Sequence, residues 1–488
     1  AGSLFSGTEC SIQEQGPVKP SFDIDEFKRY AASPAAEGLN GDVAGFSGLT
    51  PEQAEGVRYT EGPCLVIAGP GSGKTRMLTE RIKFLTGEGI AAPGELTALT
   101  FSNRAAGEIR SRLDADLVKG GLHVSTFHAF GLKFIRENIE RLYIDGDFRI
   151  LSDDERLQAV ASITSDRKEA PSALAMISSV KQGIECRADG ALLSGYVERL
   201  TELNAIDIDD LIDIPCTLLA SDRALRHEYN RRMPYLLVDE FQDINAAQYS
   251  LIRMLVSEDG KGLFVIGDPD QAIYGFRGSD VRYIEELQRD YESLKTVRLT
   301  RSFRCPGKLL MAAGQVLGKK DYLEGMDEGV KVRISRCESA RSEADLIAST
   351  IERLMGGVRS FSMDSGIADG SVSDLGLSDF AILCRSSFMF GPLIEALSNH
   401  GIPCQAVDTE PFYSAEPYRQ VMQMIRRVCS PAAQDLTAEE RTAAELLRDG
   451  RTMGDIMDIL LSARGQDFDR ERVHRMFDSV YDAGEFMR

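Results

Sequence analysis

The sequence predicts an α/β fold in which a parallel sheet carries helices on both faces. Short apolar runs recur along the chain, and stretches with helical spacing follow most of them. A glycine-rich loop joins the first of these runs to the next helical stretch. Strands that alternate with helices form parallel sheets, because each connection must cross the sheet before the next strand begins. We therefore expect a doubly wound sheet.

The composition is that of a globular protein with more than one domain. The chain has 488 residues, of which 43% are hydrophobic, and a net charge of −20. At roughly 100–200 residues per domain this length predicts two to four domains, and it excludes a disordered or fibrous chain. No apolar run approaches the roughly 20 residues that span a bilayer, so we expect no membrane association. The negative charge argues against nucleic-acid binding through overall positive charge, so any such contact must lie in a local groove.

The cysteines indicate a reducing compartment. The nine cysteines are scattered and include no Cys-x-x-Cys pair of the kind that binds zinc or performs redox chemistry. Nothing at the N-terminus has the pattern of a secretion signal. We expect reduced thiols in a cytoplasmic protein.

The first sheet domain is predicted to be interrupted by helices. Residues 1–46 are rich in Gly, Ser, Pro and Ala and are expected to be a linker or N-terminal extension. Residues 47–115 contain the first strand–helix units, and the same pattern resumes over 206–295. Between them, residues 116–205 have helical spacing and no convincing strand, which predicts a helical insertion.

A second α/β domain is predicted over residues 296–420. Two further apolar runs, at 331–334 and 380–384, are expected to be its strands, with a helix at 343–354 between them. Residues 421–488 have helical spacing and are expected to begin a second helical insertion without closing a domain. The second domain is therefore predicted to be incomplete.

The glycine-rich loop at residues 68–75 has the pattern of a P-loop. It follows an apolar strand and opens a helix, which is the context that a P-loop requires. Backbone N–H groups of such a loop surround phosphate oxygens, and the helix N-terminus adds partial positive charge. Lys74 would reach the β and γ phosphates, and the hydroxyl of Thr75 would hold Mg²⁺. A glycine turn without a ligand is disfavoured because strand, loop and helix occur in order. The expected nucleotide-binding residues are Gly69, Pro70, Gly71, Ser72, Gly73, Lys74 and Thr75.

An acidic pair follows the apolar run at residues 236–238. Asp239 would hold the magnesium shell, and Glu240 would orient and deprotonate the attacking water. A carboxylate after a buried strand is otherwise often a helix cap or a surface residue. Together with the P-loop, the pair predicts nucleotide hydrolysis with Mg²⁺.

Six segments resemble the motifs of one family. They are LTPEQ at 49–53, TFSNRAA at 100–106, STFH at 125–128, DEFQD at 239–243, GDPDQAIYGFRG at 267–278 and LTRSFR at 299–304. In order and spacing the chain resembles the superfamily 1A DNA helicases of the UvrD/Rep/PcrA type over about residues 48–420. The resemblance implies two RecA-like motor domains that use ATP and Mg²⁺. It also implies 3′→5′ translocation on single-stranded DNA and unwinding at single-strand/duplex junctions, in DNA repair or replication.

The resemblance assigns further residues to the nucleotide. Gln53 would read the adenine edge, and Phe303 would stack on the adenine where the family usually has Tyr. Gln271 and Arg304 would approach the γ-phosphate, Arg304 acting from the second domain as an arginine finger. Arg76 would line the nucleotide pocket. A site split across two domains is assembled only on closure, so ATP binding can drive domain motion. The implied catalytic residues are Lys74, Glu240, Gln271 and Arg304.

The resemblance also assigns residues to DNA. Aromatic faces hold bases without reading sequence, at roughly 1–3 kcal/mol per base. Core packing is the alternative for each aromatic residue, a structural role is the alternative for the histidine, and the arginine could instead pair with the acidic residues near Asp239. The expected DNA-binding residues are Phe101, Asn103, Thr126, Phe127, His128, Tyr274, Phe276 and Arg277. The acidic run at 206–211 also matches a family signature, but it has no evident chemical role.

Two later motifs of the family, one with a Thr-x-His-x-x-Lys-Gly core and one with a Val-Ala-x-Thr-Arg core, are absent. We therefore expect an N-terminal fragment of a longer helicase, or a degenerate one. Loss of a second γ-phosphate arginine should weaken turnover, since such residues supply roughly 10³–10⁵ in rate. Two alternatives stay open: a nucleotide-gated DNA-binding module without efficient hydrolysis, and the helicase part of a RecB/AddA-like helicase–nuclease. A protein partner could bind the N-terminal extension or the missing C-terminal region.

Overall fold

The chain divides into two compact units, Ala1–Ile334 and Ser335–Arg488, and each is described by itself. The computed structural model describes residues 48–164, 166–184, 190–275, 278–320, 322–355, 375–406, 417–428, 437–448, 451–465, 468–470 and 473–474. The predicted N-terminal extension at residues 1–46 lies outside them. None of the helices in these ranges has the length and apolar character needed to cross a bilayer.

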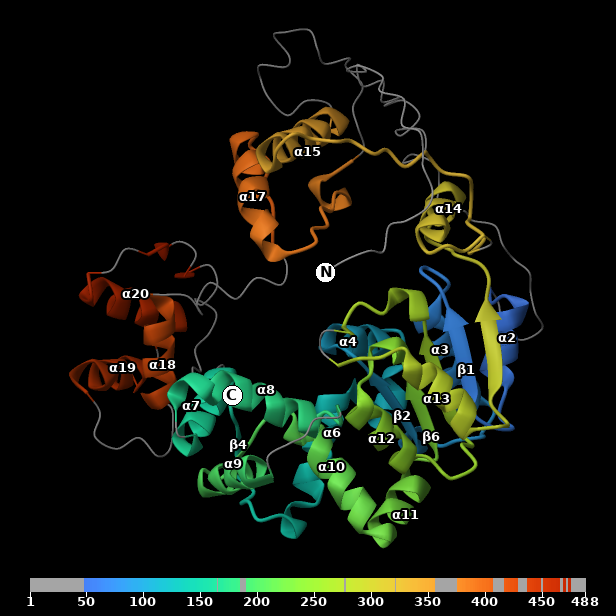
Figure 1. Cartoon of the computed structure of the whole chain (residues 1–488), viewed down its shortest axis with the longest axis horizontal. Helices are drawn as coiled ribbons and strands as arrows, with labels where there is room; N and C mark the ends of the chain where they lie inside the picture. The colour runs from blue at the N-terminus through green and yellow to red at the C-terminus, as the bar shows by residue number, and fades with distance from the viewer. Residues whose placement is uncertain are drawn as a thin grey trace. The chain divides into compact units, whose positions relative to one another are not determined.

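The first unit is built on a sheet of six strands in the order β3-β2-β6-β7-β1-β8, and all neighbouring pairs are parallel. This confirms the predicted parallel α/β fold. Figure 1 shows β1, β2 and β6 at the centre of this unit. The strands are β1 (Cys64–Ala68), β2 (Leu96–Thr100), β3 (His123–Thr126), β6 (Tyr235–Val238), β7 (Leu263–Gly267) and β8 (Lys295–Leu299).

Successive side chains of the strands enter two different hydrophobic clusters. Leu65 of β1 packs in one cluster, whereas its neighbours Cys64 and Val66 pack in the other. Side chains of a strand alternate between its two faces, so a parallel sheet that is covered on both sides is apolar at every position. Helices α2, α3 and α4 cover one face, and α6 and α10 to α13 cover the other. The helices of this unit are α2 (Pro51–Arg58), α3 (Lys74–Gly87), α4 (Asn103–Ser111), α5 (Ala115–Lys119), α6 (Phe127–Glu137), α7 (Asp153–Ile163), α8 (Ala170–Lys181), α9 (Gly190–Glu202), α10 (Asp210–Ser221), α11 (Arg223–Arg232), α12 (Ala246–Leu255), α13 (Arg282–Asp290) and α14 (Gly307–Val316).

The sheet is larger than the sequence predicted, at both of its edges. Strand β3 lies inside the stretch 116–205 that was expected to be helical, and β8 crosses the expected boundary at residue 295. Both are edge strands, and β3 carries His, Ser and Thr in place of an apolar run. A short polar edge strand has little sequence signal, because only one of its sides pairs with a neighbour.

The helical insertion after β3 has a small core of its own. Helices α7, α8 and α9 pack around Val160, Ile177, Tyr196 and Leu200. A separate two-stranded parallel sheet joins β4 (Arg149–Ile150) to β5 (Ala205–Ile206) and closes the insertion where it returns to the main sheet domain.

His123 of β3 gives a prediction for pH dependence. Burial lowers the pKa of His123 to about 4, and its Nε2 lies 3.0 Å from the Ser125 hydroxyl. Because this pKa is lower in the folded than in the unfolded chain, the neutral ring contributes stability that is lost as pH falls from about 6.5 towards 4. In an NMR titration of the five histidines, we expect one imidazole to titrate near pH 4 and to disappear in His123→Asn. A titration of that signal near 6.5 would show that the ring is solvated.

In the second unit the regular secondary structure of the described residues is helical. Helices α15 (Ala340–Leu354) and α17 (Phe390–Asn399) pack against each other through small and apolar side chains such as Ala348 and Leu397. Helices α18 (Tyr418–Val428), α19 (Ala438–Arg448) and α20 (Met453–Ala463) share another core around Ile425 and Met457.

The two strands predicted for the second domain do not form. Neither residues 331–334 nor residues 380–384 carry strand pairing, and no strand occurs within the described part of Ser335–Arg488. A strand exists only through hydrogen bonds to a neighbouring strand, so an apolar run without such a neighbour stays irregular. The predicted helix at 343–354 does form, as the larger part of α15.

Candidate nucleotide site

The glycine loop leads from β1 directly into α3. Gly71 and Gly73 have positive φ angles of 70° and 87°, a conformation that glycine adopts without strain. The Ser72 hydroxyl donates to the Gly69 carbonyl at 2.7 Å, which closes the turn. The first N–H groups of α3 have no intrahelical partners, and they carry the partial positive charge of the helix end. The loop therefore has the backbone geometry of an anion-binding site.

The predicted catalytic residues meet beside this loop. The Lys74 Nζ lies 3.1 Å from Gln271 Oε1 and 3.8 Å from Glu240 Oε2. Gln271 is held from its other side, because its Nε2 donates to Asp268 at 2.6 Å. Lys74, Glu240 and Gln271 come from three distant parts of the sequence and converge on one point.

In the acidic pair at the end of β6, burial and the neighbouring carboxylate both disfavour the ionised form of Asp239. Asp239 is only 4% exposed. Burial and the charge of Glu240 raise the pKa of Asp239 to about 7. Glu240 itself has a positive φ of 50°, which is uncommon for a residue with a side chain. The Gln242 side chain donates to the Glu240 carboxylate at 2.9 Å. The strained turn and this bond direct the Glu240 carboxylate towards Lys74.

The donor set fits a magnesium ion that arrives with a nucleotide. Burial and Glu240 both disfavour an ionised Asp239, and a divalent cation would favour it. The described residues contain no group of three or more His, Cys, Asp or Glu side chains that could hold a metal by themselves. Mg²⁺ characteristically takes one or two carboxylates and completes its shell with phosphate oxygens and water. Asp239 and the hydroxyl of Thr75 at the start of α3 match that requirement.

Gln53 is anchored against the P-loop. Its side chain is 2% exposed, its Nε2 donates to the Ser72 carbonyl at 2.8 Å, and its Oε1 accepts the Thr50 N–H at 2.9 Å. Thr50 and Gln53 thereby form the capping box of α2. The structure places Gln53 at the nucleotide loop, as its predicted role requires. Arg76 lies in the first turn of α3 with an exposed side chain.

The segment after β8 closes over the P-loop. The Phe303 N–H donates to the Gly71 carbonyl at 2.7 Å, and the Ser302 hydroxyl donates to the Pro70 carbonyl at 2.7 Å. A Cβ at Gly71 would lie 2.4 Å from the Cβ of Arg304, so the two segments are in direct contact. Phe303 and Arg304 therefore lie against the P-loop, within the compact unit Ala1–Ile334. Strand β8, which precedes them, completes the first sheet.

Sequence reasoning missed two residues that organise this site. Ser302 fastens the segment after β8 to the P-loop, and Asp268 orients Gln271. Both lie inside motifs that the sequence already singled out, next to residues that were chosen. Only their position inside these motifs could have pointed to them. A serine or an aspartate that binds other protein groups has no sequence pattern of its own.

Two of the predicted DNA-binding residues, the exposed Phe101 and the half-buried Tyr274, form a stacked aromatic pair. The rings of Phe101 and Tyr274 stack with centroids 4.9 Å apart and planes 23° apart. Phe101 is 37% exposed and follows β2, and Tyr274 lies in the segment after β7. Asn103, also exposed, begins α4. Residues that follow the carboxyl ends of two parallel strands of the sheet, β2 and β7, thus meet at one edge of the sheet, where such folds bind ligands.

The remaining DNA candidates differ from the expectation. Phe127 is 2% exposed and belongs to the core beneath α6, so the packing alternative holds for it. Thr126 is largely buried, and its hydroxyl caps α6 by accepting the Ala129 N–H at 3.2 Å. His128 is half-buried, and burial lowers the pKa of its ring. Phe276 and Arg277 lie outside the described residues.

A P-loop, an acidic pair at the end of a neighbouring strand and a parallel α/β sheet define a P-loop nucleotide-binding protein. Two family models match this chain: a UvrD/REP helicase N-terminal domain over residues 49–292, and a UvrD-like helicase C-terminal domain over residues 297–448. The chain belongs to the UvrD/REP helicase family, which confirms the resemblance drawn from its motifs.

Several relatives are similar over most of the chain. An ATP-dependent DNA helicase PcrA of Bacillus subtilis is 31% identical over 413 residues, which cover 79% of this chain and 54% of the relative. An ATP-dependent DNA helicase Rep of Buchnera aphidicola is 30% identical over 403 residues, covering 78% and 58%. A probable DNA helicase II homolog of Rickettsia conorii is 30% identical over 406 residues, covering 78% and 60%. The chain therefore spans between 54% and 60% of the length of these relatives, and the expected fragment stays a prediction.

Proposed function

We propose that this chain is an ATP- and Mg²⁺-dependent DNA helicase motor that moves 3′→5′ on single-stranded DNA and opens duplexes at single-strand junctions, in DNA repair or replication. The observation that carries the proposal is the convergence of Lys74, Glu240 and Gln271 beside the P-loop. The relatives named above are ATP-dependent DNA helicases, which supports the substrate class.

The side chains of the site divide the work of hydrolysis. Bound ATP supplies the phosphoanhydride bond whose cleavage releases free energy. Lys74 neutralises charge on the terminal phosphates, and it leaves Glu240 and Gln271 when a nucleotide enters. Glu240 then orients water and holds its proton. Gln271 lies at the beginning of the segment that leads to Tyr274, so a change at the γ-phosphate is transmitted towards the aromatic pair.

Hydrolysis measurements test the proposal. We would measure ATP turnover by the 488-residue chain alone, with single-stranded DNA and with single-stranded RNA, and unwinding of duplexes with a 3′ or a 5′ single-stranded tail. Stimulation by DNA and preference for the 3′ tail would support the motor. Nucleotide binding without DNA-stimulated turnover would instead favour the nucleotide-gated binding module, and the motor would be rejected for this chain.

The aromatic pair gives a separate prediction for DNA binding. Phe101→Ala and Tyr274→Ala should each weaken binding of single-stranded DNA by roughly 1–3 kcal/mol, because each removes a ring on which a base can stack. Their effects should not add, since the two rings stack on each other. Fluorescence anisotropy with a labelled oligonucleotide would measure the change. Tyr143, which is 94% exposed, offers a matched control, and equal weakening by Tyr143→Ala would contradict a specific role for the pair.

A cytoplasmic location is part of the proposal. The six cysteines that the structure describes are all free thiols, as a reducing compartment requires. A protein partner for the N-terminal extension or the C-terminal region stays a prediction.

A further inference from the structure

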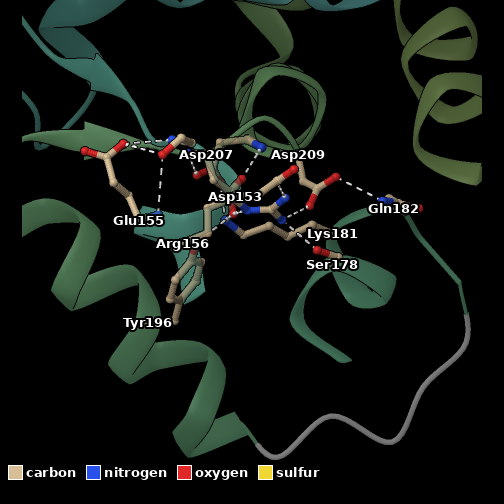
Figure 2. Close-up of polar contacts among 11 residues, drawn as sticks. Asp153, Glu155, Arg156, Ser178, Lys181, Gln182, Tyr196, Asp207 and Asp209 are labelled. Carbon is tan, nitrogen blue, oxygen red and sulfur yellow. Dashed lines mark hydrogen bonds and ion pairs between the residues drawn. The ribbon is translucent and has the colours of Figure 1, made fainter. Parts of the chain in front are cut away.

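A buried ionic cluster lies where helices α7, α8 and α9 meet the start of α10 (Figure 2). We call it the Asp209 cluster. It holds three carboxylates against two cations, and the side chains of Lys181 and Asp207 are at most 1% exposed. Charges this deep in a protein are tolerated only when each is paired and hydrogen-bonded. The members of the cluster are Arg156, Lys181, Asp207, Asp209 and Asp210.

One half of the cluster is closed on itself. Asp207 and Asp210 each accept the backbone N–H of the other at 2.9 Å, which shapes the start of α10. Lys181 lies 3.1 Å from Asp207 and 2.7 Å from Asp210, and the Tyr196 hydroxyl donates to Asp207 at 3.0 Å. These bonds join α8, α9 and α10 inside the insertion.

The other half is centred on Asp209 and reaches outwards. One carboxylate oxygen of Asp209 accepts from Arg156 of α7 at 2.5 Å, and the other accepts from the Gln182 side chain at 3.0 Å. Gln182 follows the last residue of α8. Asp209 therefore fixes the end of α8 against the start of α10, and Figure 2 shows both bonds.

The end of α8 touches the segment that follows Glu240. The Gln182 carbonyl accepts the N–H of Ala247 at 3.0 Å, in the first turn of α12. A Cβ at Gly183 would lie 2.9 Å from the Cβ of Ala246, so the two backbones are in close contact. Helix α12 begins just after the turn that carries Glu240.

The start of α10 touches α6, the helix of the DNA candidate His128. A Cβ at Gly131 of α6 would lie 1.7 Å from the Leu211 carbonyl, so only glycine allows this approach. The charge of Asp209 also acts on His128, in the first turn of α6, and opposes the effect of burial on the pKa of that ring. Asp209 is thus connected to α6 through the start of α10, and to α12 through Gln182.

We infer that Asp209 is a positioning residue that holds α6 and the Glu240–α12 segment in one register, so that DNA bound at His128 of α6 alters the rate of ATP hydrolysis. The inference rests on the proposed function. The bonds of Asp209 suit this role, because one carboxylate joins α7 and the end of α8 to the start of α10. Loss of the Asp209 charge removes the shortest ion pair of Arg156, which keeps Asp153 at 3.2 Å and Asp207 at 3.6 Å, and it releases the end of α8.

The test compares Asp209→Asn with a matched variant of the same cluster. Asparagine keeps the shape of the side chain, but it replaces one acceptor oxygen with an amide group that faces the donors of Arg156 and Gln182. Tyr196→Phe also removes one buried polar contact from the cluster, and it leaves both bonds of Asp209 in place. Gln182→Met removes only the bond between Gln182 and Asp209, and it serves if Asp209→Asn fails to fold.

Two readouts are needed. The first is ATP turnover with and without single-stranded DNA. We expect Asp209→Asn to keep unstimulated turnover within about twofold of the unaltered chain and to lose at least tenfold in stimulation by saturating DNA, while Tyr196→Phe keeps that stimulation. The second is hydrogen exchange at the Ala247 amide, which should be at least tenfold faster in Asp209→Asn than in Tyr196→Phe.

The outcomes separate the inference from the proposed function. If the unaltered chain shows no DNA stimulation, the proposed motor fails, and coupling by Asp209 fails with it, whatever the exchange at Ala247 shows. If stimulation is present and Asp209→Asn retains it, the inference is overturned and the motor stands. Equal loss in Asp209→Asn and Tyr196→Phe would show that the cluster only stabilises the insertion, and this result would also overturn the inference.

Discussion

Replacement of Glu240 with glutamine is expected to lower the rate of ATP hydrolysis by about 10²–10⁴-fold, the usual contribution of a general base. Glutamine keeps the size of the side chain and its hydrogen bond from Gln242, but it cannot accept the proton of water. Nucleotide binding should be retained, because Lys74 keeps its place beside the P-loop and loses one negative neighbour at 3.8 Å. Steady-state turnover and binding of a fluorescent nucleotide would measure the two properties separately.

Glu108→Gln is the matched control for this substitution. Glu108 is an exposed carboxylate of α4 that pairs with Arg112, and its charge also acts on Asp239. A change at Glu108 therefore tests whether any negative charge near the site is enough to support ATP turnover. Comparable loss of turnover in both variants, or full turnover in Glu240→Gln, would show that Glu240 is not the base.

Removal of the Arg304 side chain is expected to have the other large effect. An arginine that reaches the γ-phosphate in the transition state contributes roughly 10³–10⁵ in rate. The segment of Arg304 is tied to the P-loop through the Phe303 N–H and the Ser302 hydroxyl, both at 2.7 Å, so the Arg304 side chain starts beside the loop that would hold a nucleotide. We expect Arg304→Ala to lower kcat by about three orders of magnitude and to change KM for ATP much less.

The control for Arg304 is another arginine close to it in the chain. Arg298 lies in β8 with an exposed side chain, so Arg298→Ala removes equal charge without reaching the nucleotide. Arg304→Lys adds a second comparison, because a lysine keeps the charge but lacks the planar fork that binds phosphate oxygens in pairs. Turnover of Arg304→Ala within tenfold of the unaltered chain would exclude a direct role of the guanidinium.

The nucleotide loop was predictable because its chemistry is local in sequence. Gly71, Gly73 and Lys74 lie close together in one segment of the chain. The strand before them and the helix after them are both visible as hydrophobic patterns. The acidic pair after β6 was predictable for the same reason. The structure adds that Lys74 meets Glu240 and Gln271, which are more than 160 residues away along the chain.

Exposure was not predictable for the aromatic residues. Phe101 and Phe127 occur in similar positions, just after a strand, yet Phe101 is 37% exposed and Phe127 is 2% exposed. The difference arises because Phe127 packs in a core that also holds side chains of α10, α11 and α12, and those helices follow much later in the sequence. The role of the acidic run at 206–211 was also not predictable, because the partners of its carboxylates, Arg156 and Lys181, lie on other helices.

The amino-acid sequence alone was enough to specify the parallel α/β sheet, the P-loop, the acidic pair and the family, because each depends on neighbouring residues or on the order of motifs. Tertiary structure decided which edge strands join the sheet, which aromatic side chains stay exposed, that the segment of Arg304 lies against the P-loop, and that Asp209 joins the end of α8 to the start of α10. All of these depend on which distant segments pack together, and that packing is set by burial and pairing over the whole chain rather than by any local pattern.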